Sequence, residues 1–188
     1  MRNFGEAHKK DEFLEIYDKH FFPWKDKHTR LLEIGVQYGG SLKIWREYFK
    51  DLELTGVDIL PGCTQYATDT TKILIGDQSN RDFLESLGSF DIVIDDGGHT
   101  MVQQQETFKV LFPKLSSGGI YVIEDTHTSY WKQFQDSSLK TTDFVKSLTD
   151  QINADATMSS RCEEVRIENT YEISSIHFYE SVILIHKK

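Results

Sequence analysis

From about residue 30 onward, short apolar runs of strand length alternate with amphipathic stretches of helical period, and this alternation constrains the fold more than any other feature of the sequence. The apolar runs occupy residues 31–34, 54–59, 72–75, 90–94 and 120–123. After the first run, Leu42, Trp45 and Phe49 recur at spacings of three and four, which is the period of one helix face. Strands that alternate with helices form βα units around a parallel sheet buried on both faces. We therefore predict an α/β fold.

A helical pattern precedes the first predicted strand. Phe13, Tyr17 and Phe21 recur at a spacing of four residues, and Pro23 ends the pattern. We predict a helical extension over residues 1–28, in front of the α/β domain.

The last part of the chain predicts a hairpin. Residues 173–185 contain two strands joined near residues 179–180, and so short a connection makes the strands antiparallel. The polar stretch 126–156 has some apolar residues at helical spacing, and we expect it to cover an edge of the sheet or the site. With the five parallel strands, the hairpin completes a doubly wound, mostly parallel sheet of seven strands. We assign this sheet to one domain, residues 29–188.

Composition excludes several classes of protein. The chain has 188 residues, of which 38% are hydrophobic and 27% charged, as in an ordinary globular domain. Its net charge of -9 repels phosphate backbones, so we expect no nucleic-acid partner. The longest apolar runs are about five residues and the N-terminus has no signal-peptide pattern, so we expect no membrane partner. Cys63 and Cys162 do not have the spacing of a metal site, so we interpret them as reduced thiols, which fits a cytoplasmic protein. The sequence also leaves a homo-oligomer possible.

The segment after the first predicted strand is rich in glycine. It contains Gly35, Gly39 and Gly40 and ends at Ser41. Glycine lets a backbone turn sharply and approach a ligand closely, and this loop opens at the carboxyl edge of the sheet, where open α/β sheets bind ligands. It is not a phosphate-binding P-loop, because no Gly-Lys-Ser/Thr follows, and its glycine spacing does not match the dinucleotide fingerprint.

The pattern Glu-x-Gly-x-x-x-Gly-Gly-Ser resembles the first motif of class I S-adenosylmethionine-dependent methyltransferases, whose fold is Rossmann-like. The resemblance implies that Asp58, at the end of the second strand, binds the ribose hydroxyls, and that Asp77, at the end of the third, lies where that family contacts adenine. A single acid at a strand end is commonly a cap, but three acids at three successive strand ends favour a donor site. The residues assigned to the S-adenosylmethionine site are Glu33, Gly35, Tyr38, Gly39, Ser41, Asp58, Asp77, Gln78 and Asp95.

Acidic residues also end the fourth and fifth predicted strands. Asp95 and Asp96 follow one strand, and Glu124 and Asp125 follow the other. Neighbouring strands lie ~4.8 Å apart, so these carboxylates converge and repel one another unless a cation neutralises them. Oxygen ligands suit Mg²⁺, Mn²⁺ or Ca²⁺. Because side chains alternate along a strand, we assign Asp96, Glu124 and Asp125 to the metal and Asp95 to the donor side; the alternative is that these acids cap the following helices.

The spacing of these residues narrows the resemblance. An acid at Asp96, a potential base at His99 and an acidic pair at 124–125 are similar to the metal site of divalent-cation-dependent O-methyltransferases. Asp-Asp-Gly-x-His together with Glu-Asp-x-x-Thr-Ser-Tyr-Trp resembles the macrolide-sugar O-methyltransferases and their relatives named cephalosporin hydroxylases. The resemblance runs from about His20 to the C-terminus. The long N-terminal auxiliary region of the macrolide enzymes is expected to be absent, so their substrate and assembly are not implied.

The resemblance implies a metal-dependent O-methyltransferase that acts on a hydroxyl of a small molecule, with a sugar or glycoside as the leading acceptor. A hydroxyl is a poor nucleophile, so we assign neutral His99 as the general base, with Mg²⁺ or a similar cation lowering the hydroxyl pKa. His127, Tyr130 and Trp131 either line the acceptor pocket or begin a packed helix.

Two other functions stay open. One is a metal-dependent hydroxylase of the cephalosporin type, although no clear set of two His and one carboxylate is present. The other is a binding module that kept the donor fold without catalysis.

Overall fold

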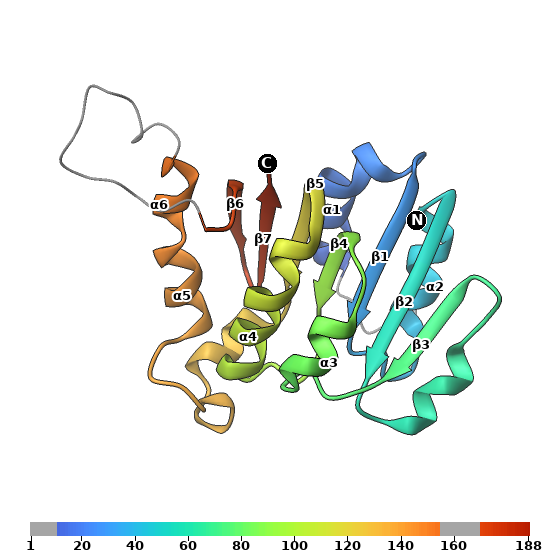
Figure 1. The fold of residues 1–188 in the computed structure, drawn as a ribbon, viewed down its shortest axis with the longest axis horizontal. Helices are drawn as coiled ribbons and strands as arrows, with labels where there is room; N and C mark the ends of the chain where they lie inside the picture. The colour runs from blue at the N-terminus through green and yellow to red at the C-terminus, as the bar shows by residue number, and fades with distance from the viewer. Residues whose placement is uncertain (1–10, 155–169) are drawn as a thin grey trace.

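A seven-stranded sheet runs through the computed structural model, which describes residues 11–154 and 170–188 (Figure 1). The strand order is β3-β2-β1-β4-β5-β7-β6. The strands are β1 (His28–Ile34), β2 (Asp51–Asp58), β3 (Thr71–Ile75), β4 (Phe90–Asp95), β5 (Leu115–Ile123), β6 (Ile173–Tyr179) and β7 (Val182–Lys187). The first five are parallel, whereas β7 is antiparallel to both β5 and β6. The predicted α/β fold, with its C-terminal hairpin, is confirmed.

Helices cover both faces of the sheet (Figure 1). They are α1 (Asp11–Phe21), α2 (Gly40–Tyr48), α3 (Arg81–Ser86), α4 (Met101–Leu111), α5 (Thr141–Ser147) and α6 (Thr149–Ile152). Short 3-10 turns are η1 (Phe22–Trp24), η2 (Pro61–Tyr66), η3 (Phe112–Lys114), η4 (Thr126–Tyr130) and η5 (Lys132–Phe134). The buried side chains of α1 and α2 pack on one face, and those of α3, α4 and α5 pack on the other.

Alternation along the strands produces these two faces. Leu31 of β1 packs with Tyr17 of α1 and Trp45 of α2, whereas the next residue, Leu32, packs on the other face with Phe108 of α4. All five side chains are at most 2% exposed. Complete burial of such side chains contributes about 1.5–3 kcal/mol each. The two core clusters therefore hold the central strands between two helical layers.

The N-terminal helix is part of this core. Phe13, Tyr17 and Phe21, which the spacing placed on one face, are buried against the sheet. The predicted domain boundary at residue 28 stays a prediction, and residues 1–10 lie outside the described residues. Cys63 is a buried free thiol, as predicted, while Cys162 also lies outside the described residues.

The polar stretch that was expected to cover an edge or the site forms η4, η5, α5 and α6. Its helical segment α5 packs against α4 and contributes Phe144 and Val145 to the core. Within the described residues, none of the helices combines the length and the apolar character that a bilayer crossing requires.

Candidate functional site

The carboxyl ends of the parallel strands are level with one another. Ile34 of β1 lies opposite Asp95 of β4, and Asp95 lies opposite Ile123 of β5. The backbone amides of Asp96 and Glu124 extend the ladder by one residue, donating to the carbonyl oxygens of Ile34 and Asp95 at 2.9 Å. The loops that follow these strands therefore begin side by side at one edge of the sheet.

A cavity of about 610 Å³ opens along this edge. That volume lies within the ~300–1,000 Å³ typical of small-molecule sites. The predicted donor residues that line it are Gly35, Tyr38, Ser41, Asp58, Asp77 and Gln78. The predicted metal, catalytic and substrate residues that line it are Asp96, His99, Glu124, Asp125 and His127. One cavity therefore contains residues from both halves of the predicted site.

Five predicted site residues are not among the lining residues: Glu33, Gly39, Asp95, Tyr130 and Trp131. Glu33 is fully buried, and its Oε2 accepts a hydrogen bond at 2.8 Å from Ser41 Oγ at the start of α2. The Tyr130 hydroxyl lies 3.5 Å from Thr142 Oγ1 of α5. The Trp131 ring packs edge-on against His127, with ring centroids 4.6 Å apart. Glu33 and Trp131 thus each contact a residue that lines the cavity, whereas Tyr130 lies beside α5.

Gly35 lies where the loop after β1, in the donor half of the predicted site, meets the loop after β4, in the metal half. Its φ is +94°, a conformation that side-chain-bearing residues rarely adopt. A Cβ atom at this position would lie 1.9 Å from the carbonyl oxygen of Asp96. Only glycine lets the loop after β1 lie directly against the loop after β4.

Asp58 organises the loop after β1. Its Oδ2 accepts hydrogen bonds from the backbone amides of Val36 and Gln37, both at 2.9 Å, and its Oδ1 accepts one from Leu60 at 2.8 Å. Burial by itself raises the pKa of Asp58, but these three hydrogen bonds outweigh it, so the net pKa is lowered. The carboxylate is therefore ionised and fixed at the wall of the cavity.

Gln78 connects the donor loops to the loop after β4. Its Nε2 donates to Asp95 Oδ1 at 3.0 Å, and its Oε1 accepts from the backbone amide of Gly98 at 2.6 Å. Asp95 is 1% exposed, and its Oδ2 also accepts a hydrogen bond from the Tyr121 hydroxyl at 3.4 Å. Burial raises the pKa of Asp95 to about 7, although the Gln78 hydrogen bond opposes the rise. Asp95 therefore supports the loops from beneath the cavity.

At the other end of the cavity, Asp96, His99 and Asp125 each offer one potential ligand atom, and these atoms lie within 4.8 Å of one another. His99 Nε2 lies 3.6 Å from Asp125 Oδ2. His99 and Asp125 have φ values of +59° and +52°, in the left-handed region where His and Asp are several-fold enriched over other non-glycine residues. Two residues with left-handed backbone therefore contribute side chains to the group around Asp96.

Glu124 has a different environment from its neighbour Asp125. It lines the cavity but is only 3% exposed, and its Oε1 accepts a hydrogen bond at 2.5 Å from the hydroxyl of Tyr17 in α1. The group of potential ligand atoms therefore contains His99 beside the two aspartates, whereas the predicted metal set contained Glu124. The sequence pattern gives Tyr17 no site role, because its helical spacing marks it only as a core residue.

Charge in the cavity is strongly one-sided. Among the described lining residues, none is Lys or Arg, and the acidic ones are Asp58, Asp77, Asp96, Glu124 and Asp125. Carboxylates gathered at one edge of a low-dielectric site repel one another, and a divalent cation relieves that repulsion. An oxygen-rich set with one imidazole suits Mg²⁺ or Mn²⁺ better than the sulfur- and nitrogen-rich sets of structural zinc. The side chains present therefore fit a hard divalent cation.

A seven-stranded, mostly parallel sheet with an antiparallel strand beside β5, and a ligand cavity at its carboxyl edge, places the chain in the Rossmann-like class of doubly wound α/β proteins. Within that class the chain belongs to the methyltransferase family, since a profile described as a methyltransferase domain matches residues 32–126.

Two curated relatives extend the match over nearly the whole chain. The 8-demethyl-8-alpha-L-rhamnosyl tetracenomycin-C 2'-O-methyltransferase of Streptomyces olivaceus is 34% identical over 94% of this chain and 50% of its own length. The mycinamicin VI 2''-O-methyltransferase of Micromonospora griseorubida is 34% identical over 93% of this chain and 48% of its own. The chain thus spans about half the length of these relatives.

A solved structure shows the same similarity. The MycE methyltransferase of the mycinamycin biosynthetic pathway, in complex with Mg and SAH, superposes with a TM-score of 0.83 at 32% identity. The match covers 93% of this chain and 49% of that one. The fold and family predicted from the sequence are confirmed, and the individual site residues stay predictions.

Proposed function

We propose that this protein transfers the methyl group of S-adenosylmethionine to a hydroxyl of a small molecule, a sugar or a glycoside, in a reaction that requires Mg²⁺ or a similar cation. The observation that carries the proposal is the single cavity, which the predicted donor loop lines at one end and Asp96, His99 and Asp125 line at the other. Methyl transfer requires this arrangement, because the donor and the activated hydroxyl must meet in line.

The donor end fits an adenosyl ligand. Asp58 presents an ionised carboxylate to accept hydrogen bonds from ribose hydroxyls, and Asp77 and Tyr38 flank it on the loops after β3 and β1. Gly35 lets a ligand approach the backbone closely, and Gln78 fixes this loop to the one after β4. We propose that Glu33, Gly39 and Asp95 support the donor site from behind it.

The acidic end fits the cation. We propose Asp96 and Asp125 as its direct ligands, with Glu124, positioned by Tyr17, completing the predicted set. A cation held there would lower the pKa of a neighbouring hydroxyl and so make its oxygen a better nucleophile. The similar MycE methyltransferase was solved in complex with Mg and SAH, which supports a cation and an adenosyl donor in the same protein.

His99 then serves as the general base. Its Nε2 takes the proton from the acceptor hydroxyl, and the imidazolium that forms is stabilised by Asp125 Oδ2, which lies 3.6 Å from Nε2. The backbone carbonyl of His99 accepts a hydrogen bond from Thr128 Oγ1 at 3.0 Å, so the loop after β5 holds the base in place.

Three observations support a sugar or glycoside as the acceptor. One relative is named as a 2'-O-methyltransferase of an alpha-L-rhamnosyl tetracenomycin, and a second is named as a 2''-O-methyltransferase of mycinamicin VI. His127 lines the cavity, and Trp131 packs against His127 and so provides an aromatic wall nearby. The sheet edge also carries oxygen ligands rather than a cationic patch, which favours a neutral polyol over a phosphorylated partner. We also propose a cytoplasmic location, in keeping with the free thiol of Cys63.

A hydroxylase of the two-His-one-carboxylate type is the weaker candidate. The group of potential ligands at this edge has two carboxylates and one imidazole, which reverses the ratio of that iron site.

Calorimetry and an activity assay test the proposal. S-adenosylmethionine and S-adenosylhomocysteine are expected to bind protein stripped of metal with EDTA, because the donor residues are separate from the acidic cluster. Methyl transfer from labelled donor to a panel of deoxysugar glycosides is expected only when Mg²⁺ is restored. Binding of NAD instead of the adenosyl donor, or full activity in EDTA, would contradict the proposal.

A pair of variants localises donor binding. Asp58→Asn is expected to weaken S-adenosylhomocysteine binding by about 10- to 100-fold, the size of a lost charge-assisted hydrogen bond. The control is Asp69→Asn, since Asp69 is an exposed acid in the β2–β3 connection. Equal binding by both variants would place the donor elsewhere.

A further inference from the structure

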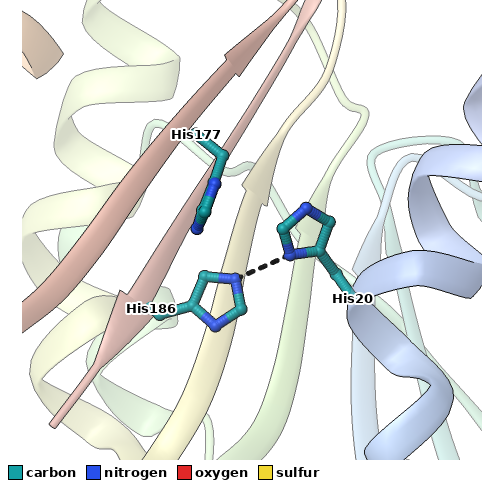
Figure 2. Close-up of side chains that lie close together, drawn as sticks. All are labelled: His20, His177 and His186. Carbon is teal, nitrogen blue, oxygen red and sulfur yellow. Dashed lines mark hydrogen bonds between the residues drawn. The ribbon is translucent and has the colours of Figure 1, made fainter.

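Three histidines meet between α1 and the C-terminal hairpin, one helical turn along α1 from Tyr17. His20 is in the last turn of α1, His177 is in β6 and His186 is in β7 (Figure 2). His20 Nδ1 lies 3.0 Å from His186 Nε2, and the centroid of the His177 ring lies 4.7 Å from that of His20 and 5.2 Å from that of His186 (Figure 2). One ligand atom from each of the three lies within 4.8 Å of the others. The cluster thus joins residues that are more than 150 positions apart in the chain.

The imidazoles are held in the state that binds metals. Burial, together with the nearby rings, lowers the pKa of His20 and of His186 to about 4, so both are neutral at neutral pH and have a ring lone pair available. The second nitrogen of His20, Nε2, lies 2.9 Å from the Tyr179 hydroxyl, and Nε2 of His177 lies 3.0 Å from Ser175 Oγ. Metal-binding histidines typically use the second nitrogen in this way, which fixes the ring orientation.

We propose that His20, His177 and His186 form a binding site for a divalent transition metal, such as Zn²⁺, that is separate from the acidic cluster. Three neutral imidazoles with a water in the fourth position are a known coordination set for zinc, with Zn–N distances of ~2.0–2.1 Å. Tetrahedral ligand atoms at that distance are ~3.3 Å apart, so the pair at 3.0 Å already fits and His177 closes on the ion by a small rotation. On binding, the ring that carries the N–H between His20 and His186 loses that proton to solvent and takes one up on its second nitrogen, so both rings stay neutral and each offers a lone pair to the ion.

A metal ion bound at this site would hold α1 against the C-terminal hairpin. The same helix contributes Tyr17, which lies one turn before His20. The Tyr17 hydroxyl donates a hydrogen bond to Glu124 in the cavity. An ion that binds the folded chain, in which the three ligands are together, stabilises it by mass action. The metal would therefore fix α1 against β6 and β7, and with α1 the position of Tyr17.

The positive charge of Lys19 lies near the histidine cluster and lowers its affinity for a cation. Lys19 Nζ donates to the Tyr179 hydroxyl at 3.1 Å, so a cation already lies next to the residue that orients His20. Removal of this charge with Lys19→Met is expected to tighten zinc binding by about two- to fivefold, because Lys19 is exposed and its field is screened.

Zinc binding to the tag-free full chain tests the proposal. The protein is stripped with a chelator and titrated with Zn²⁺ in excess Mg²⁺, which occupies oxygen sites in preference to imidazole sites. We expect one equivalent of zinc to bind and the melting temperature to rise by ~5–10 °C at a zinc concentration 100 times the Kd. Co²⁺ in place of Zn²⁺ is expected to give the visible absorption bands of a tetrahedral site. No binding and no shift would overturn the proposal.

Variants assign the bound ion to the cluster. His177→Ala, on a half-buried strand position, and His186→Gln are expected to lose the zinc equivalent and the rise in melting temperature. The matched control is His28→Ala, because His28 is an exposed histidine on β1 outside the cluster, and it is expected to bind zinc like the parent chain. Asp125→Asn is also expected to retain zinc. Zinc that is lost only in Asp125→Asn would place the ion in the acidic cluster and refute the proposal. Zinc that is retained in His177→Ala would also refute the proposed three-histidine site.

Discussion

Strand β4 has acidic residues at both ends, and the two ends are built differently. At its amino end, Asp91 is 7% exposed and is surrounded by hydrogen-bond donors. The Arg30 guanidinium donates to both carboxylate oxygens, at 3.0 and 3.3 Å, and the Arg30 backbone amide donates at 2.8 Å. The hydroxyl of Ser116 donates to Oδ1 at 2.6 Å. The protein itself thus balances the charge of Asp91.

At the carboxyl end of the same strand, Asp96 lies in the cavity with Asp125 and His99. The described residues that line this cavity include five acids and no Lys or Arg. The two ends show that a buried carboxylate can serve two purposes in this protein. At the amino end a carboxylate held by a guanidinium stabilises the fold, whereas at the carboxyl end two carboxylates and an imidazole offer ligand atoms to an external cation.

The largest expected effect follows from neutralising the carboxyl end. Asp96→Asn is expected to lower methyl transfer on the order of 10³- to 10⁴-fold, because loss of a cation ligand removes several kcal/mol of charge stabilisation from the transition state. The free energy of unfolding, measured with urea, is expected to stay the same or to rise, since one repelling charge is gone. Asp82→Asn, at an exposed position in α3, is the matched control. A stable, fully active Asp96→Asn protein would contradict the proposal that the carboxyl end of β4 binds a cation.

The second effect concerns the base. His99→Ala is expected to lower the rate of methyl transfer by ~10²- to 10⁴-fold while donor and Mg²⁺ affinities are kept. Alanine at a φ of +59° also strains the backbone, so His99→Asn, which tolerates this conformation, separates loss of the imidazole from strain. Equal losses in both variants with metal binding intact support a base. Loss of Mg²⁺ binding instead would make His99 a ligand, and near-normal turnover would move the base to another residue, with His127 next.

Neutralising the amino end should give the opposite result. Asp91→Asn is expected to lower the free energy of unfolding by about 2–3 kcal/mol, below the range for fully buried pairs because the Arg30 side chain is about a third exposed. The kcat of the folded enzyme is expected to be unchanged, because Asp91 is at the edge of the sheet opposite the cavity. A loss of activity without a loss of stability would contradict the assignment of the two ends.

The pH dependence of stability sharpens this prediction. Burial raises the pKa of Asp91, but hydrogen bonds from Arg30 and Ser116 outweigh it, so the folded-state pKa lies below the unfolded value of ~3.9. The unfolded chain then binds more protons, so the stabilisation is complete above about pH 4 and is lost as the pH falls through the folded-state pKa. The difference between parent and Asp91→Asn in urea unfolding is therefore expected to shrink below about pH 4. A constant difference down to pH 2 would show that packing, rather than charge, causes it.

The smallest expected effect is at Tyr17, which connects the N-terminal helix to the acidic end. Tyr17→Phe removes the hydrogen bond to Glu124 and is expected to lower Mg²⁺ affinity or activity by about tenfold, the lower end of the range for residues that orient metal ligands. Tyr48→Phe is the control, because the Tyr48 hydroxyl donates to Asp18 on the surface. Equal activity of the two variants would remove Tyr17 from the site.

The sequence predicted the elements at the sheet edge well, because strand ends can be read from local patterns. Once the parallel sheet was inferred, Asp58, Asp96 and Asp125 had to lie at one edge, and the structure places all three in one cavity. The sequence assigned both Glu124 and Asp125 to the metal and did not show that their environments differ. Asp125 has a left-handed backbone with a φ of +52°, which Asp adopts more often than most residues but which its neighbours in the sequence do not indicate.

Contacts between distant segments were beyond sequence patterns. The partner of the Tyr17 hydroxyl is 107 residues away, and His20 and His186 are 166 residues apart. Helical spacing placed Tyr17 in the core, which is correct for its ring and uninformative about its hydroxyl. The His177–His186 half of the cluster follows from the hairpin register, but nothing in the sequence shows that α1 packs against that hairpin.

The packing of α1 against the hairpin also sets an order of events during synthesis. At ~5–20 residues per second, the 166 residues that separate His20 from His186 take a ribosome roughly 8–30 s to add. Until then α1 can pack against β1 and α2, but His20 has neither of its partners in β6 and β7. This helix thus completes its native contacts only after the last two strands of the sheet are made.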